Sequence, residues 1–150
     1  MKKIVRTLWV GALSGMAILT ACCDTKGLSR QERKLLIKER NNIQEILKAR
    51  EGECVYGSPE VMEEYRVETY RLRNQLDSID AKLGKDVDLE KSARRLKLHE
   101  ELAKLRAILY EREHSCVYGS PEVMEEYGRE TRRLHGEAQK IVDELRELEN

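Results

Sequence analysis

The 150-residue sequence contains no Phe, one Trp and two Pro, and its 28 basic side chains are balanced by 28 acidic ones. A chain without a basic excess lacks the electrostatic footprint of a nucleic-acid-binding protein. Beyond residue 21 the aromatic side chains are six Tyr, so a core there has to be built from Leu, Ile, Val, Met and Ala. No apolar run reaches the ~20 residues that a membrane-spanning helix needs.

Motifs that carry catalysis are also missing. The sequence has no Cys-x-x-Cys, no Gly-rich phosphate loop and no Ser/His/Asp set in a supporting motif. Glu111 and His114 have the spacing found in di-iron helical bundles, but such a site needs two such pairs and two further Glu. Carboxylate pairs on solvated helices keep ordinary pKa values and are poor acid–base catalysts. We therefore predict that the protein is not an enzyme and has no metal ion or cofactor.

The N-terminus has the organisation of an export signal. A basic start without acids precedes an apolar run over residues 8–19, which is too short for a membrane span and typical of a secretory signal peptide. The run ends in Leu19-Thr20-Ala21-Cys22, which resembles the lipobox of bacterial lipoproteins. That resemblance implies cleavage of a signal peptide over residues 1–21, acylation of Cys22 and a lipidated tether over residues 22–28. An ordinary secretory signal is the alternative.

The resemblance also implies a place for the protein. A Cys22 that carries several acyl chains would anchor the domain stably in a lipid bilayer. In this family an Asp directly after the lipidated Cys favours the inner membrane, whereas here Cys23 takes that position and the acid is Asp24. We therefore expect the outer membrane, with the periplasmic or external face left open.

An internal repeat organises the remaining chain. The segment CVYGSPEVMEEY occurs twice, at residues 54–65 and 116–127, with all twelve positions identical at an offset of 62. At that offset 7 of 23 positions agree before the segment (29–51 against 91–113) and 6 of 18 after it (66–83 against 128–145). Uniform drift after a duplication would not leave one perfect segment. Geometry, binding or recent gene conversion has kept it identical.

The apolar positions after each copy step by three and four residues, which is the heptad seam of packed helices. The two seams are Met62, Tyr65, Thr69, Leu72, Leu76, Ile79, Leu83 and Met124, Tyr127, Thr131, Leu134, Ala138, Ile141, Leu145. The preceding segments contribute Leu36, Ile43, Ile46, Leu47 and Leu98, Leu105, Ile108, Leu109. We predict an all-α fold, an up-down-up-down antiparallel four-helix bundle of two repeated hairpins. The hairpins span residues 29–83 and 89–150, joined by a linker turn over residues 84–88. In the alternative, the hairpins close into a bundle only by dimerising.

Capping chemistry predicts where the helices begin. Ser29 and Glu32 form a capping box, so the first helix should begin near residue 30. Ser-Pro-Glu at residues 58–60 and 120–122 starts two more helices, and Gly57 and Gly119 are expected to supply backbone freedom for the turns before them. The sequence Leu-Gly-Lys-Asp at residues 83–86 ends the second helix, and Asp86 or Asp88 caps the third.

The repeat also predicts a disulfide. Cys54 and Cys116 lie at matching points of two loops expected at one end of the bundle, in a compartment that permits oxidation. Closing that loop would contribute about 4 kcal/mol in the chain-entropy model.

The two repeated loops form the candidate binding site, at the end of the bundle furthest from the membrane. Tyr56 and Tyr118, with Val55 and Val117, either plug the end of the bundle or face a partner. Acids beside them would form a rim that favours a basic partner: Glu63, Glu64, Glu125 and Glu126. For Glu60 and Glu122 a capping role is favoured.

These patterns support a membrane-anchored, non-enzymatic helical module that binds an unidentified envelope protein through the loop tip. A second hypothesis is a self-associating coiled-coil spacer, a homodimer or longer array. A third is a carrier of a lipid or small molecule, or an inhibitor of an envelope-directed toxin.

Overall fold

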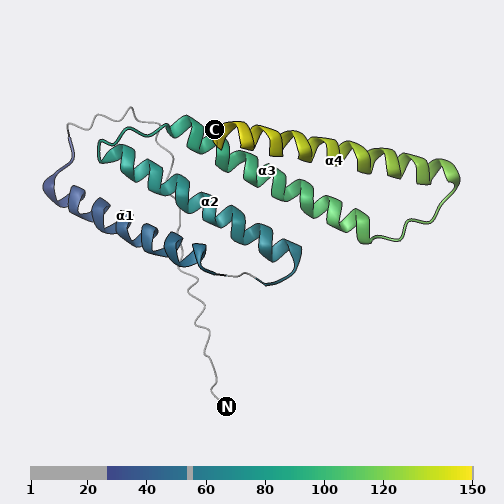
Figure 1. Ribbon diagram of the computed structural model, residues 1–150, viewed down its shortest axis with the longest axis horizontal. Helices are drawn as coiled ribbons and strands as arrows, with labels where there is room; N and C mark the ends of the chain where they lie inside the picture. The colour runs from purple at the N-terminus through teal and green to yellow at the C-terminus, as the bar shows by residue number, and fades with distance from the viewer. Residues whose placement is uncertain (1–26, 54–55, 150) are drawn as a thin grey trace, which may run out of the picture.

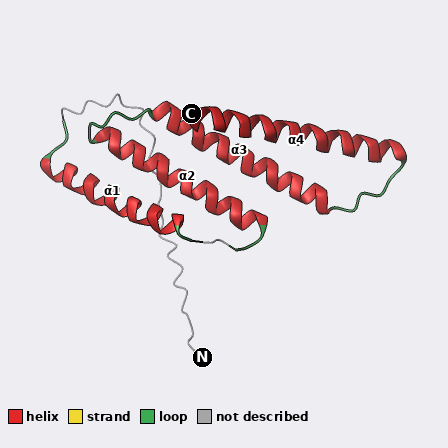
Figure 2. Cartoon of the chain, in the orientation of Figure 1, coloured by secondary structure: helices red, strands yellow, loops and turns green. Residues whose placement is uncertain are grey.

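The computed structural model describes residues 27–53 and 56–149, and its regular structure there is entirely helical (Figures 1 and 2). The helices are α1 (Arg30–Glu51), α2 (Pro59–Lys82), α3 (Leu89–His114) and α4 (Pro121–Glu149). The all-α prediction is therefore confirmed for this part of the chain. The signal peptide, the lipobox and Cys22 lie outside the described residues.

Local chemistry sets the helix boundaries. Ser29 and Glu32 make the predicted capping box, with the Glu32 carboxylate 2.8 Å from the Ser29 N–H, and the Asp88 carboxylate caps α3. Helices α2 and α4 begin at a proline, as predicted. The Ser58 side chain, however, makes no capping hydrogen bond to the backbone of α2.

The four helices form a row in which each one packs against its neighbours in the chain. Contacts join α1 to α2, α2 to α3 and α3 to α4, and within the described ranges none joins α1 to α4. Figure 1 shows α1 and α4 at opposite edges of this row, with the chain reversing direction after each helix. The packing is consistent with a helical bundle, but the first and last helices do not close it into a ring.

Each hairpin has its own hydrophobic core. In the first, Ile43, Leu47 and Ile79 are buried, and Leu36, Leu72, Leu76 and Leu83 pack against them. In the second, Leu98, Leu102 and Leu145 are buried, and Ala138, Ile141, Val142 and Leu148 pack against them. Most of these side chains belong to the predicted seams. For four positions the core prediction is wrong, because their side chains are exposed: Met62, Met124, Ile46 and Ile108.

The interface between the hairpins differs from the interfaces within them. Val67 of α2 is buried, and the ring of Tyr70, also of α2, stacks on the His99 imidazole of α3. The positions of α4 that correspond to Val67 and Tyr70 are Arg129 and Arg132, and both are exposed. The face of α4 that corresponds to the α3-facing side of α2 is therefore polar at these two positions.

Candidate functional site

The two repeated loops present their tyrosines to solvent. Tyr56 is 89% exposed and Tyr118 is 90% exposed, each in the connection that leads into a proline-started helix. Figure 1 shows both connections toward the same end of the row. The expectation that these tyrosines plug the end of the bundle is wrong. Cys54 and Val55 lie outside the described residues.

Each loop is bracketed by the same set of contacts, which we call the Arg–Tyr clasp. In the second hairpin the Arg112 guanidinium donates to the Tyr127 carbonyl at 3.0 Å and to the Thr131 hydroxyl at 3.1 Å. It also lies 3.9 Å from the centre of the Tyr127 ring, and the Tyr127 hydroxyl donates back to the Arg112 carbonyl at 2.8 Å. These bonds tie the end of α3 to the start of α4.

The first hairpin repeats the clasp with Arg50, Tyr65 and Thr69. The Arg50 guanidinium donates to the Tyr65 carbonyl at 3.1 Å and to the Thr69 hydroxyl at 3.0 Å, and it lies over the Tyr65 ring. The sequence analysis did not identify Arg50 and Arg112 as important, because both lie outside the twelve-residue segment. The signal was present, since Arg50 and Arg112 agree at the repeat offset.

The loop glycines have a different role from the one predicted. Gly84 is the glycine with a left-handed backbone in the described residues, at φ 86°, and neither Gly57 nor Gly119 has a positive φ. A Cβ at Gly119 would lie 2.9 Å from Cγ1 of Val123, and one at Gly57 would lie 3.1 Å from Cγ1 of Val61. Space for a stiff β-branched side chain, rather than backbone freedom, therefore explains both loop glycines.

The predicted acidic rim is not symmetric. The side chain of Glu63 is 17% exposed and ion-paired with Arg66 and Arg106, whereas that of Glu125 is 74% exposed. The prediction that Glu63 faces a partner is wrong, because it faces α3 instead. Glu64 and Glu126 are exposed, as a rim requires. Hydrogen bonds from Ser58 and Ser120 lower the pKa of Glu60 and Glu122, which agrees with their expected role at the helix start.

Cysteine and histidine chemistry is limited in the described residues. Cys116 is an exposed free thiol, so the structure does not support its predicted bond to Cys54. Nδ1 of His114 lies 2.8 Å from the Tyr110 carbonyl. Across residues 27–53 and 56–149, no three His, Cys, Asp or Glu side chains gather as a metal site would require.

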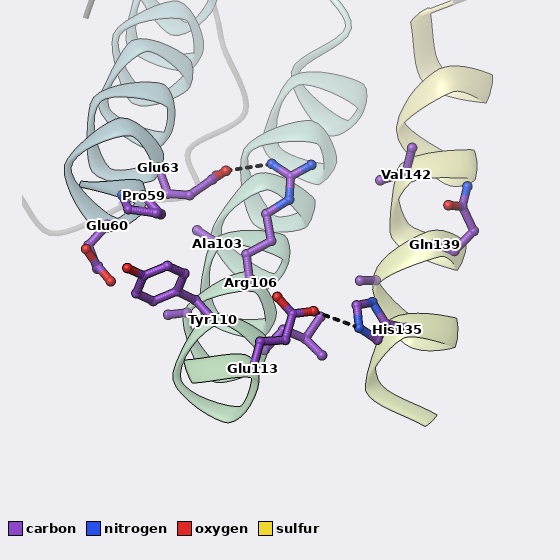
Figure 3. A pocket seen from close by; sticks show the side chains of 13 residues that line it. Pro59, Glu60, Glu63, Ala103, Arg106, Tyr110, Glu113, His135, Gln139 and Val142 are labelled. Carbon is purple, nitrogen blue, oxygen red and sulfur yellow. Dashed lines mark hydrogen bonds and ion pairs between the residues drawn. The ribbon is translucent and has the colours of Figure 1, made fainter. Parts of the chain in front are cut away.

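A groove that the sequence did not predict runs over α3, between α2 and α4. It has a volume of about 400 Å³, and its lining includes Ala103 and Ala107 of α3. Figure 3 shows this groove from close by. The Glu63–Arg106 ion pair, at 2.6 Å, joins α2 to α3 on one side of it, and Oε1 of Glu113 lies 3.2 Å from Nε2 of His135 on the α4 side. The groove forms because these alanine side chains are small and α3 has a helix on each side.

Comparison with protein-family models, curated proteins and solved structures found no match for this chain. Of the helices that the structure describes, none combines the length and apolar character required to cross a bilayer.

Proposed function

We propose that the protein is a lipid-anchored lipoprotein of the bacterial envelope, attached through acylated Cys22, and that its repeated loops bind another envelope protein without catalysis. The lipobox supports the anchor. Cys23, rather than an Asp, directly after Cys22 supports the outer membrane as its location. The proposed anchor lies at the start of the chain, so the helical row would hold the loops away from the bilayer.

The exposure of Tyr56 and Tyr118 is the observation that carries the binding proposal. The fold explains other identical positions of the segment: tyrosines 65 and 127 belong to the clasps, and the loop glycines make room for valines. No intramolecular contact of the described residues explains why the nearly fully exposed tyrosines are identical. Tyr offers a large contact area at low entropy cost, which suits a recognition surface.

Photo-crosslinking in the source bacterium tests this proposal. A crosslinking residue replaces Tyr118, and the matched control replaces Lys140, which is exposed on the same helix hairpin. We expect one discrete protein adduct from position 118 and none from position 140. The variant with Tyr56→Ser and Tyr118→Ser should lose the partner while its helicity stays unchanged. Equal recovery of the partner by the double variant contradicts the proposal.

Self-association is a second candidate, supported by an apolar stripe on α1. Leu35 and Ile46 lie three helical turns apart on one face of this edge helix, and both are exposed. A second copy could cover them and close the open row into a full bundle, as in the dimeric alternative given above. Sedimentation equilibrium of wild type and of the Leu35→Glu, Ile46→Glu variant tests this candidate. A concentration-independent monomer for the wild type would exclude it.

A further inference from the structure

A second pocket lies where the two hairpins meet, and the tip proposal does not use it. Its volume is about 310 Å³, and side chains from α2, α3 and α4 line it. Arg66 and Tyr70 come from α2, and His99 and Arg106 come from α3. Arg106 also lines the groove of Figure 3, where its contact with Glu63 is drawn. The pocket and the groove share Arg106 and Val142 in their linings and are therefore adjacent.

His99 is a buried polar side chain whose ring nitrogens lack hydrogen-bond partners among the described residues. It is 8% exposed, and its ring stacks on Tyr70 with 3.4 Å between the ring centres. Neither Nδ1 nor Nε2 has a hydrogen-bond partner in the described part of the chain, and Nε of Arg95 is buried without one as well. Buried polar atoms in proteins are almost always hydrogen-bonded, so this imidazole requires an explanation.

The charges around His99 are mainly positive. Arg66 and Arg106 both contact the same carboxylate oxygen of Glu63, at 2.9 and 2.6 Å, so one acid serves two guanidinium groups. Burial, followed by the charges of Arg66, Arg106, Arg95 and Arg73, lowers the pKa of His99 to about 4. From α4, Arg146 and Glu149 add one charge of each sign to the lining. The imidazole is therefore neutral at pH 7 and lies in a positive potential.

We propose that this pocket binds an oxyanion, a phosphate or carboxylate group, through His99, Arg66 and Arg106. A neutral imidazole can donate one N–H, and each guanidinium has five donors, of which Glu63 uses few. Charged donors that converge on one site are the arrangement that proteins use for phosphate and carboxylate. The group can belong to a free anion or to the headgroup of a lipid, which offer the same chemistry.

The equivalent positions of the repeat do not duplicate the site. At the repeat offset, Arg66, His99 and Arg106 correspond to Gly128, Ile37 and Gln44, which cannot reproduce it. Three residues that differ between the copies thus gather at the junction between the hairpins. This proposal is independent of the loop tip, and either can fail without the other.

Histidine NMR of the full chain in a neutral detergent tests the proposal, with His99→Gln identifying the His99 signal. Inorganic phosphate is titrated at pH 7 while chloride keeps the ionic strength constant. We expect a saturable shift of the His99 signal and a rise of its apparent pKa, because a bound anion stabilises the imidazolium. The signals of His114 and His135 should not saturate with it.

Two arginine variants link the shift to the pocket. Arg106→Gln, which introduces the residue found at the equivalent position of the first hairpin, should weaken phosphate binding ~10-fold or more. Arg71→Gln is the matched control, because Arg71 also joins α2 to α3, through Glu100 at 2.8 Å, but does not line the pocket. It should leave the affinity within ~2-fold of wild type. Arg66→Gln replaces Arg106→Gln if the latter loses helicity.

A second arm distinguishes the two sources of the oxyanion. The same signals are recorded with phosphatidylglycerol vesicles and with phosphatidylcholine vesicles in place of phosphate. A His99 shift with phosphatidylglycerol alone identifies a lipid headgroup as the ligand, and a shift with inorganic phosphate identifies a free anion. Absence of a saturable shift in both arms, or equal shifts in Arg106→Gln and wild type, overturns the proposal.

Discussion

The Arg–Tyr clasp predicts a large stability loss from a single change near the loop, Arg112→Met. Methionine keeps most of the length of the side chain but removes its charge and its donors. The substitution deletes the hydrogen bonds to the Tyr127 carbonyl and the Thr131 hydroxyl, each with a net contribution of about 1 kcal/mol. Loss of the cation–π contact at 3.9 Å adds about 0.5–1 kcal/mol.

The acceptors left behind add no further penalty. The Tyr127 carbonyl still accepts from the Thr131 hydroxyl at 2.9 Å, so it does not become an unpaired buried group. The free energy of unfolding should therefore fall by about 2–3 kcal/mol. The midpoint of thermal unfolding should fall by roughly 5–10 °C.

Urea unfolding followed by far-UV circular dichroism measures this change. Arg129→Met is the matched control, because Arg129 is an exposed arginine of α4 that pairs with Glu125 at 3.6 Å. Its loss should not exceed about 0.5 kcal/mol. Arg50→Met, in the first clasp, should resemble Arg112→Met. If Arg112→Met loses no more stability than Arg129→Met, the clasp does not hold the hairpin together and the reasoning is wrong.

Three further predictions concern pH, glycine and the free thiol. Since His99 has a pKa of about 4 when folded and about 6.5 when unfolded, the unfolded chain binds more protons between these values and stability falls as pH falls through that window. His99→Leu should remove up to about 2 kcal/mol of the stability that is lost between pH 7 and pH 4.5 in urea unfolding, and equal losses in variant and wild type contradict this. Gly119→Ala should lower the free energy of unfolding by about 1 kcal/mol, because the new Cβ meets the Val123 side chain. Gly136→Ala adds a Cβ in open space within α4 and should raise that free energy by about 0.5–1 kcal/mol in the same assay. Changes of the same sign in both variants refute the steric explanation. Cys116 should react with iodoacetamide in the native protein, as intact mass reveals, and protection that disappears on reduction would instead show a disulfide.

The sequence by itself determined the helices, because their boundaries depend on neighbours within a few residues. The Ser29 capping box, the Asp88 cap and the two proline starts are local chemistry, and each helix begins where these signals place it. The seams at three- and four-residue steps likewise identified most of the positions that form the two cores, since a helix presents such residues on one face.

Tertiary structure decided what identical residues do. Glu63 and Glu125 occupy the same place in identical segments, yet Glu63 is paired with arginines and Glu125 is exposed. The physical reason is position in the row: α2 has a helix on each side, whereas α4 has one. The buried imidazole of His99 and the pocket around it arise for the same reason, because they require the surfaces of two different hairpins to meet.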